Sequence, residues 1–262
     1  MKSKKNLIRL GVPGMKPGHV PLERALSKLG IATRTQARAL ILAGKVRVNG
    51  VIKKVPVMGV VPEKIRVEIE GEADSKTDAK TFLLHKPRGI ITTHADEKGR
   101  PNVFQLLEKE NLHLIAVGRL DFATSGLLLL TNDTKLAAYL TDPSNSVKRT
   151  YVVSVRGKIE EADLRKICEG IQDDGDLLRA DDVILRKSSA KESHLTIELS
   201  EGKNREIRRI FESLGSEVTK LKRIAYGRLE LGNLAPGDYR RITIEELKKC
   251  FPHAPVREDL AL

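Results

Sequence analysis

The segment GRLDFATSGLLLLTND, residues 118–133, contains four consecutive leucines that follow a bend rich in glycine and hydroxyl residues. A short apolar run between turn residues predicts a strand buried on both faces, so Leu127–Leu130 are expected at the centre of a sheet. Asp121 stands at the entrance to this strand. Such a carboxylate is either a turn residue that bonds nearby amides, which is the commoner case for an isolated aspartate, or a group placed for chemistry.

The residues next to Asp121 favour an ionised carboxylate. In an extended chain, residues two apart point to the same side, so Arg119 and Asp121 are expected to share a face while Leu120 packs inward. A neighbouring cation favours the charged form of a carboxyl group and lowers its pKa. Asp121 is therefore a candidate nucleophile or base at neutral pH.

The overall composition is typical of a soluble chain of one or two domains. The 262 residues are 40% hydrophobic and 31% charged, and no apolar run approaches the roughly 18 residues of a membrane-spanning helix. The basic segment 1–20 lacks the continuous apolar centre of a signal peptide. Cys168 and Cys250 lie far apart, without the spacing of a metal site. We expect a cytoplasmic protein that does not associate with membranes.

The positive charge of the chain is concentrated at its N-terminal end. Residues 1–71 contain fifteen Lys or Arg and four Asp or Glu, which accounts for +11 of the total charge of +12. Clustered positive charge is typical of proteins that bind nucleic acid, whereas scattered lysines more often form a solubilising face. Here the charges accompany a compact segment with regular apolar spacing, which favours RNA or DNA as the partner.

This segment predicts two helices and a hairpin. Leu22, Ala25, Leu26 and Leu29 recur at helical spacing, and a second helix precedes Gly44. The sequence VRVNGVIKK then alternates like a strand around Asn49-Gly50, a strong signal for a two-residue hairpin. A cationic face is expected beside the second helix and the hairpin, formed by Arg34, Arg38, Lys45 and Arg47.

At this point the chain resembles the RNA-binding domain first seen in the fourth small-subunit ribosomal protein. The resemblance rests on the first helix, on TRTQARALILAGKVRVNG and on the later IRVEI. It implies a small basic α/β domain over residues 20–71 that contacts structured RNA through Arg34, Arg38, Lys45 and Arg47. Residues 1–19 are expected to be a basic extension that is disordered until it meets RNA, and the polar residues 72–80 a linker.

From Thr81 onward, predicted strands outnumber predicted helices. TFLLHKPRGIITTH reads as two strands interrupted at Lys86-Pro87, and TYVVSVRG and SHLTIELSEG read as strands. TNDTKLAAYL predicts a short helix, and NREIRRIFESLG a helix capped by Asn204. Several strands are linked too briefly for helical crossovers. We therefore predict an α+β protein whose catalytic domain, residues 81–250, has a mixed, mainly antiparallel sheet flanked by helices and is followed by a tail, residues 251–262.

The motifs that are missing narrow the chemistry. The chain has neither a GxxxxGK[ST] phosphate loop nor a GxGxxG turn, and its six histidines are dispersed. No cluster of carboxylates and histidines has the spacing of metal ligands. Catalysis is therefore expected to need no metal and no cofactor, and to use Asp, Tyr, Arg and Lys.

Three further residues favour a catalytic role for Asp121 over a role in the turn alone. Lys86 stands at a proline-restricted strand end, and Tyr151 follows basic and polar residues in KRTYVV. In the helix from Asn204, Arg208 lies at the edge of an apolar stripe, about 100° from Ile207, and can reach a half-buried carboxylate. The alternative for Arg208 is a surface pair with Glu212. Its neighbours Arg205 and Arg209 are expected to face away.

Together these stretches resemble the pseudouridine synthases that act on ribosomal RNA, in the branch with the N-terminal RNA-binding domain. The matching pieces, in the order of the family, are HKPRG, VGRLDFATSGLLLLTND, KRTYVVSVRG and GKNREIRRIFESLG. NREIRRIF is most similar to large-subunit members, although many relatives carry glutamine in place of Glu206. The resemblance implies site-specific isomerisation of uridine to pseudouridine in ribosomal RNA, with the large subunit favoured over the small one.

The resemblance also implies roles for the candidate site residues. Asp121 is the essential carboxylate, Tyr151 stacks on the target base, and Arg208 pairs with Asp121. Arg119 is a candidate to fill the stack vacated by a flipped base, and Lys86 a candidate substrate contact. The expected partner is ribosomal RNA or an assembly intermediate of the ribosome, bound by a monomer without a cofactor.

Two other functions are alternative interpretations of the basic domain and of Asp121. A non-catalytic RNA-binding or ribosome-assembly factor would use the basic domain alone, with Asp121 as a turn residue. A different RNA-modifying enzyme, such as a methyltransferase, would need a glycine-rich cofactor turn after the first catalytic-domain strand. LLHKPRGIITTH offers one glycine and a proline there, which disfavours the methyltransferase.

Overall fold

The computed structural model describes residues 18–29, 31–32, 34–70, 79–93, 96, 99–110 and 114–257. The chain divides into two compact units, Met1–Thr77 and Asp78–Leu262. The predicted extension 1–19 and linker 72–80 lie outside the described residues except at 18–19 and 79–80, and the predicted tail is described as far as residue 257. Within the described part of the chain, no helix is long and apolar enough to cross a membrane.

The N-terminal unit contains the predicted helices and hairpin. Val48 pairs with Val51 across the Asn49-Gly50 turn, where both turn residues have positive φ, as a tight hairpin requires. The helices bury Leu22, Ala25, Leu26, Ala37 and Ile41 against the strands in one cluster. The elements are β1 (Val20–Pro21), α1 (Leu22–Lys28), α2 (Arg34–Leu42), β2 (Val46–Val48), β3 (Val51–Lys53), β4 (Gly59–Val60), η1 (Pro62–Lys64) and β5 (Val67–Ile69), with the sheet orders β3-β2-β5 and β1-β4.

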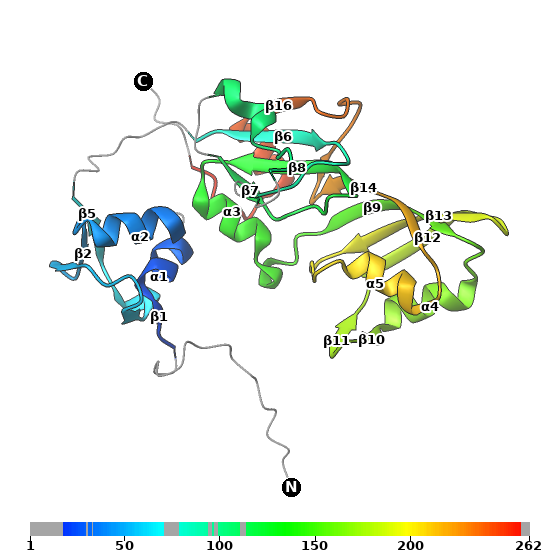
Figure 1. The fold of residues 1–262 in the computed structure, drawn as a ribbon, viewed down its shortest axis with the longest axis horizontal. Coiled ribbons are helices and arrows are strands. Elements are labelled where there is room, and N and C mark those ends of the chain that lie inside the picture. Colours follow the sequence, from blue (N-terminus) through cyan, green and yellow to red (C-terminus); the bar gives the residue numbers. More distant parts are fainter. Residues whose placement is uncertain are drawn as a thin grey trace, which may run out of the picture. The chain divides into compact units, whose positions relative to one another are not determined.

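The C-terminal unit is built on one large sheet with the strand order β12-β13-β9-β14-β8-β6-β16 (Figure 1). Among these neighbours only β14 and β8 are parallel, which confirms the predicted mixed, mainly antiparallel sheet. Strand β7 also pairs with β8 and β15 with β14, and β10 pairs with β11 in a separate hairpin. The strands are β6 (Thr81–Lys86), β7 (Ile115–Val117), β8 (Ser125–Thr131), β9 (Arg149–Arg156), β10 (Ile171–Asp173), β11 (Asp176–Leu178), β12 (Asp182–Ser188), β13 (Glu192–Leu199), β14 (Val218–Tyr226), β15 (Leu229–Glu230) and β16 (Tyr239–Ile242).

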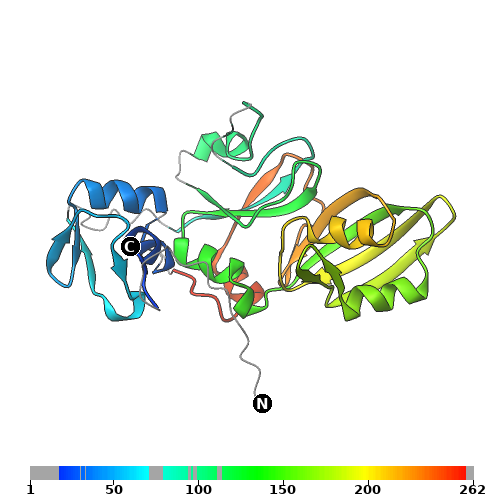
Figure 2. The ribbon, with the colours of Figure 1, turned by 60° about the horizontal axis from the view of Figure 1, so that its bottom comes forward.

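Helices cover the sheet, and they bury the four leucines of β8 on both of its faces. Leu128 and Leu130 belong to a cluster with β9, β13 and α5, whereas Leu127 and Leu129 pack with α3 and α6. Figures 1 and 2 show α4 and α5 together over one face of β9 and β13. The helices of this unit are η2 (Gln105–Glu110), α3 (Thr134–Thr141), η3 (Pro143–Asn145), α4 (Glu161–Glu169), α5 (Glu206–Ser213) and α6 (Ile244–Cys250). The LLLL run is therefore a central strand, as its sequence predicted.

Two local predictions need correction. The second strand expected after Pro87 is not formed, because the chain turns at Arg88-Gly89 and Ile91 makes only an isolated bridge to Asn102. The N-cap of α5 is Arg205 and not Asn204. Arg205 has φ +50°, in the left-handed region that few residues other than glycine adopt. Its side chain therefore does not take the direction that was predicted for a residue inside a regular helix.

Gly126 allows the two halves of the sheet to join. It has φ +112° and pairs with Arg223 of β14 at the parallel ladder. A Cβ atom at this position would lie 2.2 Å from the carbonyl oxygen and 2.6 Å from the nitrogen of Arg223. Any side chain would therefore push β8 and β14 apart at the point where the turn that carries Asp121 enters the sheet.

We predict that Gly126→Ala lowers the free energy of unfolding of the C-terminal unit by at least about 3 kcal/mol, because the clash adds to the cost of the positive φ. Gly175→Ala is the matched control, since Gly175 also has positive φ but a Cβ atom there would meet nothing within 4 Å. The control should lose about 1 kcal/mol. Urea unfolding followed by circular dichroism measures both, and equal losses would contradict the close approach.

Candidate active site

A pocket of about 100 Å³ opens between the turn that precedes β8 and the N-terminal end of α5. It brings together four of the predicted site residues, Arg119, Asp121, Tyr151 and Arg208, which come from three distant parts of the chain. We call it the Asp121 pocket. Its other lining residues are Leu120, Thr124, Leu199, Gly202, Lys203, Arg205, Glu206, Ile207 and Leu221.

Asp121 lies in a tight turn that ends at Thr124, directly before β8. The amide of Thr124 donates to the carbonyl of Asp121 at 3.0 Å. The amide of Gly89 donates to the carbonyl of Phe122 at 2.8 Å. Thr92 holds Leu120 just before the turn, because its hydroxyl donates to the Leu120 carbonyl at 2.9 Å. The Asp121 side chain remains 39% exposed, so the carboxylate is accessible from the pocket.

Lys86 lies under this turn and is completely buried. Its Nζ donates to the carbonyl oxygens of Pro87 and Asp121, each at 3.1 Å, and to that of Thr124 at 2.8 Å. Burial lowers the pKa of Lys86 to about 8, against the opposing attraction of Asp121. Lys86 does not line the Asp121 pocket, and its donors are used by the backbone. The predicted contact of Lys86 with substrate stays a prediction, and in the structure Lys86 holds the backbone of the turn.

Arg208 approaches Asp121 from α5. Its Nε lies 3.9 Å from Oδ2 of Asp121, while Nη1 donates to the Val218 carbonyl at 3.2 Å and Nη2 to the Ala123 carbonyl at 3.5 Å. The side chain is only 13% exposed. Burial lowers its pKa, as does Arg205, and Asp121 acts in the opposite direction. The edge position predicted from the apolar stripe thus leads to Asp121 and not to Glu212.

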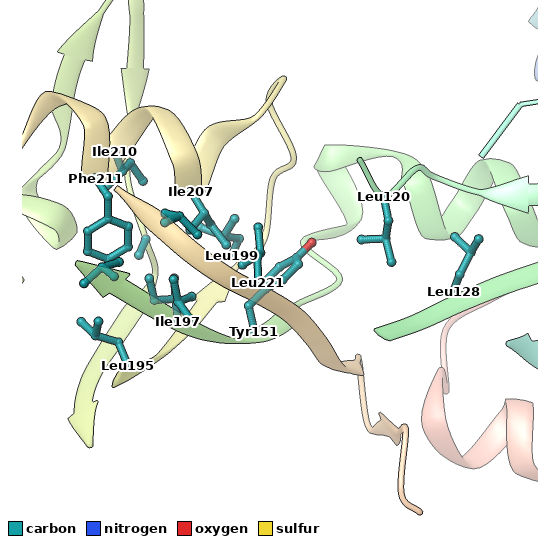
Figure 3. Close-up of a cluster of buried hydrophobic side chains, with 14 of the residues drawn as sticks. Leu120, Leu128, Tyr151, Leu195, Ile197, Leu199, Ile207, Ile210, Phe211 and Leu221 are labelled. Atoms are coloured by element: carbon teal, nitrogen blue, oxygen red, sulfur yellow. The ribbon is translucent and has the colours of Figure 1, made fainter. Parts of the chain in front are cut away.

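Tyr151 forms the apolar wall of the pocket. Its side chain is on the face of β9 that packs against α5, and the residue is only 9% exposed. Figure 3 shows the ring beside Leu199, Ile207 and Leu221, with the hydroxyl directed away from the deeper cluster around Phe211. Tyr151 is the one aromatic side chain among the described residues that line the pocket.

Several buried polar atoms in this pocket lack a partner. Among the described residues, four buried side-chain atoms make no hydrogen bond, and three of them belong to pocket residues: Thr124 Oγ1, Glu206 Oε1 and Arg208 Nε. An unsatisfied buried polar atom costs about 1–3 kcal/mol, so such atoms are rare and need an explanation. Most of the unsatisfied buried atoms among the described residues thus belong to side chains that build the Asp121 pocket.

Glu206 was not predicted as a site residue. Its Oε2 accepts a hydrogen bond from the Lys203 amide at 3.0 Å, and the residue is only 3% exposed. Burial raises its pKa, although the bond from Lys203 opposes the shift. Thr124 and Arg205 were also missed. The only signal for Glu206 was its unusual identity at a position where relatives carry glutamine, and the ATSG sequence around Thr124 was interpreted as a turn alone.

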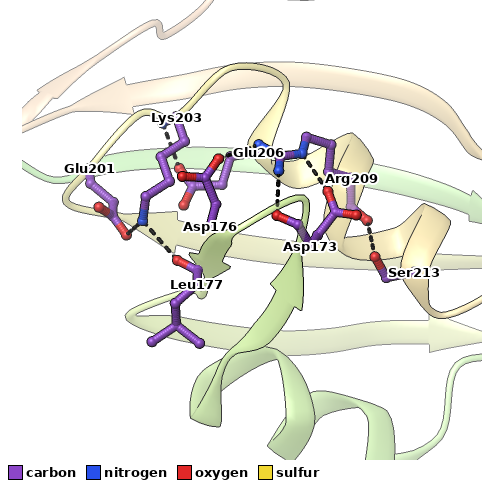
Figure 4. A network of polar contacts seen from close by, with 8 residues as sticks. All are labelled: Asp173, Asp176, Leu177, Glu201, Lys203, Glu206, Arg209 and Ser213. Carbon is purple, nitrogen blue, oxygen red and sulfur yellow. Dashed lines mark hydrogen bonds and ion pairs between the residues drawn. The ribbon is translucent and has the colours of Figure 1, made fainter. Parts of the chain in front are cut away.

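A polar network supports the loop between β13 and α5 (Figure 4). Arg209 donates to the carboxylates of Asp173 and Asp176 at 2.5 and 2.9 Å. Lys203 donates to the Glu201 carboxylate at 2.6 Å and to the Leu177 carbonyl at 2.8 Å. The network ties this loop, which forms one wall of the pocket, to the β10-β11 hairpin. Arg209 faces away from Asp121, as expected.

In the N-terminal unit, three of the four predicted RNA-binding residues have acidic partners. Arg34 and Arg38 lie 3.7 and 3.4 Å from the buried Glu23, and Arg47 lies 3.8 Å from Glu70. Lys45 is exposed, just before β2. The arginines remain accessible, with side chains 39–65% exposed, so the pairs hold them at the surface without removing them from it.

The described residues contain no group of three or more His, Cys, Asp or Glu side chains that could hold a metal ion. Among the described residues that line the Asp121 pocket, the ionisable side chains are Asp121, Glu206, Lys203, Tyr151 and three arginines.

Both units of the chain are similar to known proteins. Residues 80–213 match the RNA pseudouridylate synthase family, and residues 20–60 match the S4 domain. The chain is 39% identical over 231 residues to ribosomal large subunit pseudouridine synthase B of Bacillus subtilis, covering 87% of this chain and 94% of that protein. It is 34% identical to the protein of the same description from Vibrio vulnificus, covering 86% of this chain and 72% of that one. A crystal structure of pseudouridylate synthase superposes with a TM-score of 0.62 at 28% identity, covering 88% of this chain and 99% of that one.

We predict that Lys86→Met changes how stability depends on pH. The pKa of Lys86 is about 8 in the folded protein and 10.5 as the ordinary value. Between these pH values the unfolded chain binds more protons, so the free energy of unfolding of the wild type rises with pH relative to the variant, by at most about 1.4 kcal/mol per pH unit. Urea unfolding at pH 7, 8, 9 and 10 measures the difference. Parallel curves would show that Lys86 does not carry a shifted pKa.

Proposed function

This chain belongs to the RNA pseudouridylate synthase family, with an S4 domain before its catalytic domain, and we propose that it converts a specific uridine of ribosomal RNA to pseudouridine. Large-subunit RNA is the favoured substrate, because the relatives from Bacillus subtilis and Vibrio vulnificus are described as ribosomal large subunit enzymes. The observation that carries the proposal is the meeting of Asp121, Arg208 and Tyr151 in one pocket.

The proposed reaction is an isomerisation. The bond from N1 of uracil to C1′ of ribose breaks, the base turns, and a bond forms between C5 and C1′. The proton on C5 is lost and N1 gains a proton, so the sum of atoms and electrons is unchanged. No second substrate or redox partner is required, which suits a pocket built from Asp, Arg and Tyr side chains.

Asp121 is the proposed catalytic carboxylate. It could attack C1′, attack the uracil ring, or remove a ribose proton, and all three roles require an ionised and correctly aimed group. Arg208 supplies the opposite charge at 3.9 Å, and its Nε has no other partner among the described residues. Hydrogen bonds at catalytic groups often tighten only when the substrate is bound. Lys86 holds the turn in place from behind.

A uridine in structured RNA must leave its stack before it can enter the pocket. Extrusion costs a few kcal/mol, and contacts elsewhere on the RNA can offset that cost. Tyr151 would stack on the flipped base from the apolar wall, and the exposed Arg119 at the rim would fill the space it leaves. Arg34, Arg38, Lys45 and Arg47 of the S4 domain would bind the phosphates that anchor the RNA or the assembly intermediate.

We predict that Asp121→Asn abolishes pseudouridine formation and leaves RNA affinity within about twofold, because the amide keeps the shape but loses the charge. Release of tritium from RNA labelled at C5 of uridine measures turnover, and filter binding measures affinity. Asp182→Asn, at an exposed position on β12, should keep full activity. Full turnover by Asp121→Asn would remove this residue from the mechanism. The absence of turnover in the wild type on its ribosomal RNA would favour the rival assembly factor.

We predict that Lys45→Ala combined with Arg47→Ala weakens RNA binding and makes the slope of log K against log salt shallower by about 1.4–1.8, because two phosphate contacts are lost. Lys158→Ala combined with Lys166→Ala is the control. It removes the same charge from two exposed lysines beside and on α4, both paired with carboxylates. Equal slopes for the two double variants would contradict the assignment of the S4 domain as the RNA anchor.

A further inference from the structure

The arginine side chains around the Asp121 pocket differ in their hydrogen bonds and ion pairs. Within the described residues, no hydrogen bond or ion pair involves the side chains of Arg88, Arg119 or Arg205. Arg208 and Arg209, which follow along the same segment, are held by backbone carbonyls and by carboxylates. Arg88 and Arg205 are both close enough to Arg208 to lower its pKa. Two arginines that line the pocket, Arg119 and Arg205, therefore have no ion-pair partner among the described residues.

Arg205 has the most constrained position of the three. It is the N-cap of α5 at φ +50° and ψ +29°, a conformation that costs a residue with a Cβ roughly 1 kcal/mol or more. Glycine or asparagine would satisfy this backbone more readily. The fold therefore accepts local strain to present a long cationic side chain at the start of the helix.

Arg205 also stands between two hollows. It lines the Asp121 pocket and, together with Arg208, a second hollow of about 490 Å³. The second hollow runs along the end of α5 to the start of β14, and its other lining residues are Glu212, Gly215, Ser216, Glu217 and Val218. Because both hollows are lined by Arg205 and Arg208, they adjoin each other at these two side chains.

The charges of the second hollow are arranged along its length. Arg205 and Arg208, which also line the Asp121 pocket, come from the start of α5, whereas Glu212 lies about one helical turn after Arg208 and Glu217 directly precedes β14. Glu217 is paired with Arg156 at 3.3 Å. A phosphate is therefore attracted to the pocket end, while the small residues Gly215 and Ser216 leave room for a neutral ribose or base beyond it.

We infer that Arg205 binds a phosphate adjacent to the flipped uridine and directs the flanking RNA strand into the hollow between α5 and β14. This inference rests on the proposed function and specifies which part of the substrate the site holds besides the base. An arginine fork suits a phosphate because it can donate two parallel hydrogen bonds. Arg205 is thus a substrate-binding residue that acts outside the reaction centre.

The first test compares full-length Arg205→Gly with Arg165→Gly in single-turnover assays on a transcript of large-subunit ribosomal RNA. Glycine removes the side chain and relieves the positive φ, so the start of α5 is kept. Arg165 is an exposed arginine on α4 and is the control for charge. We expect the enzyme concentration at half-maximal rate to rise about tenfold for Arg205→Gly alone, with the maximal rate unchanged. Arg205→Lys should recover part of the loss.

A maximal rate that falls while the half-maximal concentration stays constant would overturn the inference, as would equal behaviour of Arg205→Gly and Arg165→Gly. The salt slope of RNA binding gives a second readout, and we expect it to become shallower by about 0.7–0.9 for Arg205→Gly. Thermal unfolding midpoints should not fall, because glycine fits the backbone. A lower midpoint together with an unchanged salt slope would show a structural role and overturn the inference.

Neutral methylphosphonate linkages locate the contact. Placed singly on either side of the target uridine, one linkage should weaken binding by the wild type about tenfold and should not weaken binding by Arg205→Gly further. Additive losses at every position would overturn the inference. The same binding measurements in the Asp121→Asn background need no turnover. They separate failure of this contact from failure of the proposed function, which is tested by tritium release.

Discussion

The bonds from Nζ of Lys86 to the carbonyl oxygens of Asp121 and Thr124 fix the turn on which the site depends. A turn between two strands has few apolar contacts of its own, and Phe122 at its tip is 47% exposed. The buried ammonium group joins both ends of the turn to strand β6, which is itself fully buried. Burial at this position opposes the charge of Lys86 and lowers its pKa.

With the turn fixed from behind, the remaining cations act from the front. Arg208 is anchored by the carbonyls of Val218 and Ala123, and it leaves Nε directed toward Asp121. One carboxylate is thus enclosed by a cation that holds its backbone and a cation that faces its side chain. Preorganised charges of this kind cost no rearrangement at the moment of reaction. The unpaired atoms Thr124 Oγ1 and Glu206 Oε1 are buried in side chains that line the same pocket.

The sequence predicted those parts of the site that follow from local periodicity. The LLLL run implied a strand buried on both faces, and the stripe of Ile207, Ile210 and Phe211 placed Arg208 at a helix edge. Features that depend on one dihedral angle or on distant register could not be predicted. The left-handed conformation of Arg205 turns its side chain from the expected direction toward the pocket, and the burial of Lys86 depends on a turn 35 residues later. The carboxylates that engage Arg209 come from a hairpin without a clear strand pattern.

The position of β14 in the sheet affects how the enzyme folds during its synthesis. This strand lies between β8 and β9, yet the chain produces it after both, and the family match ends at residue 213, before it begins. Leu221 and the Val218 carbonyl come from β14, so part of the apolar wall and one of the two carbonyls that anchor Arg208 are absent earlier in synthesis. Until then, β8 and β9 are open sheet edges that can pair with other chains. A nascent or truncated chain that lacks β14 therefore exposes the unpaired edges of β8 and β9, and we expect it to aggregate.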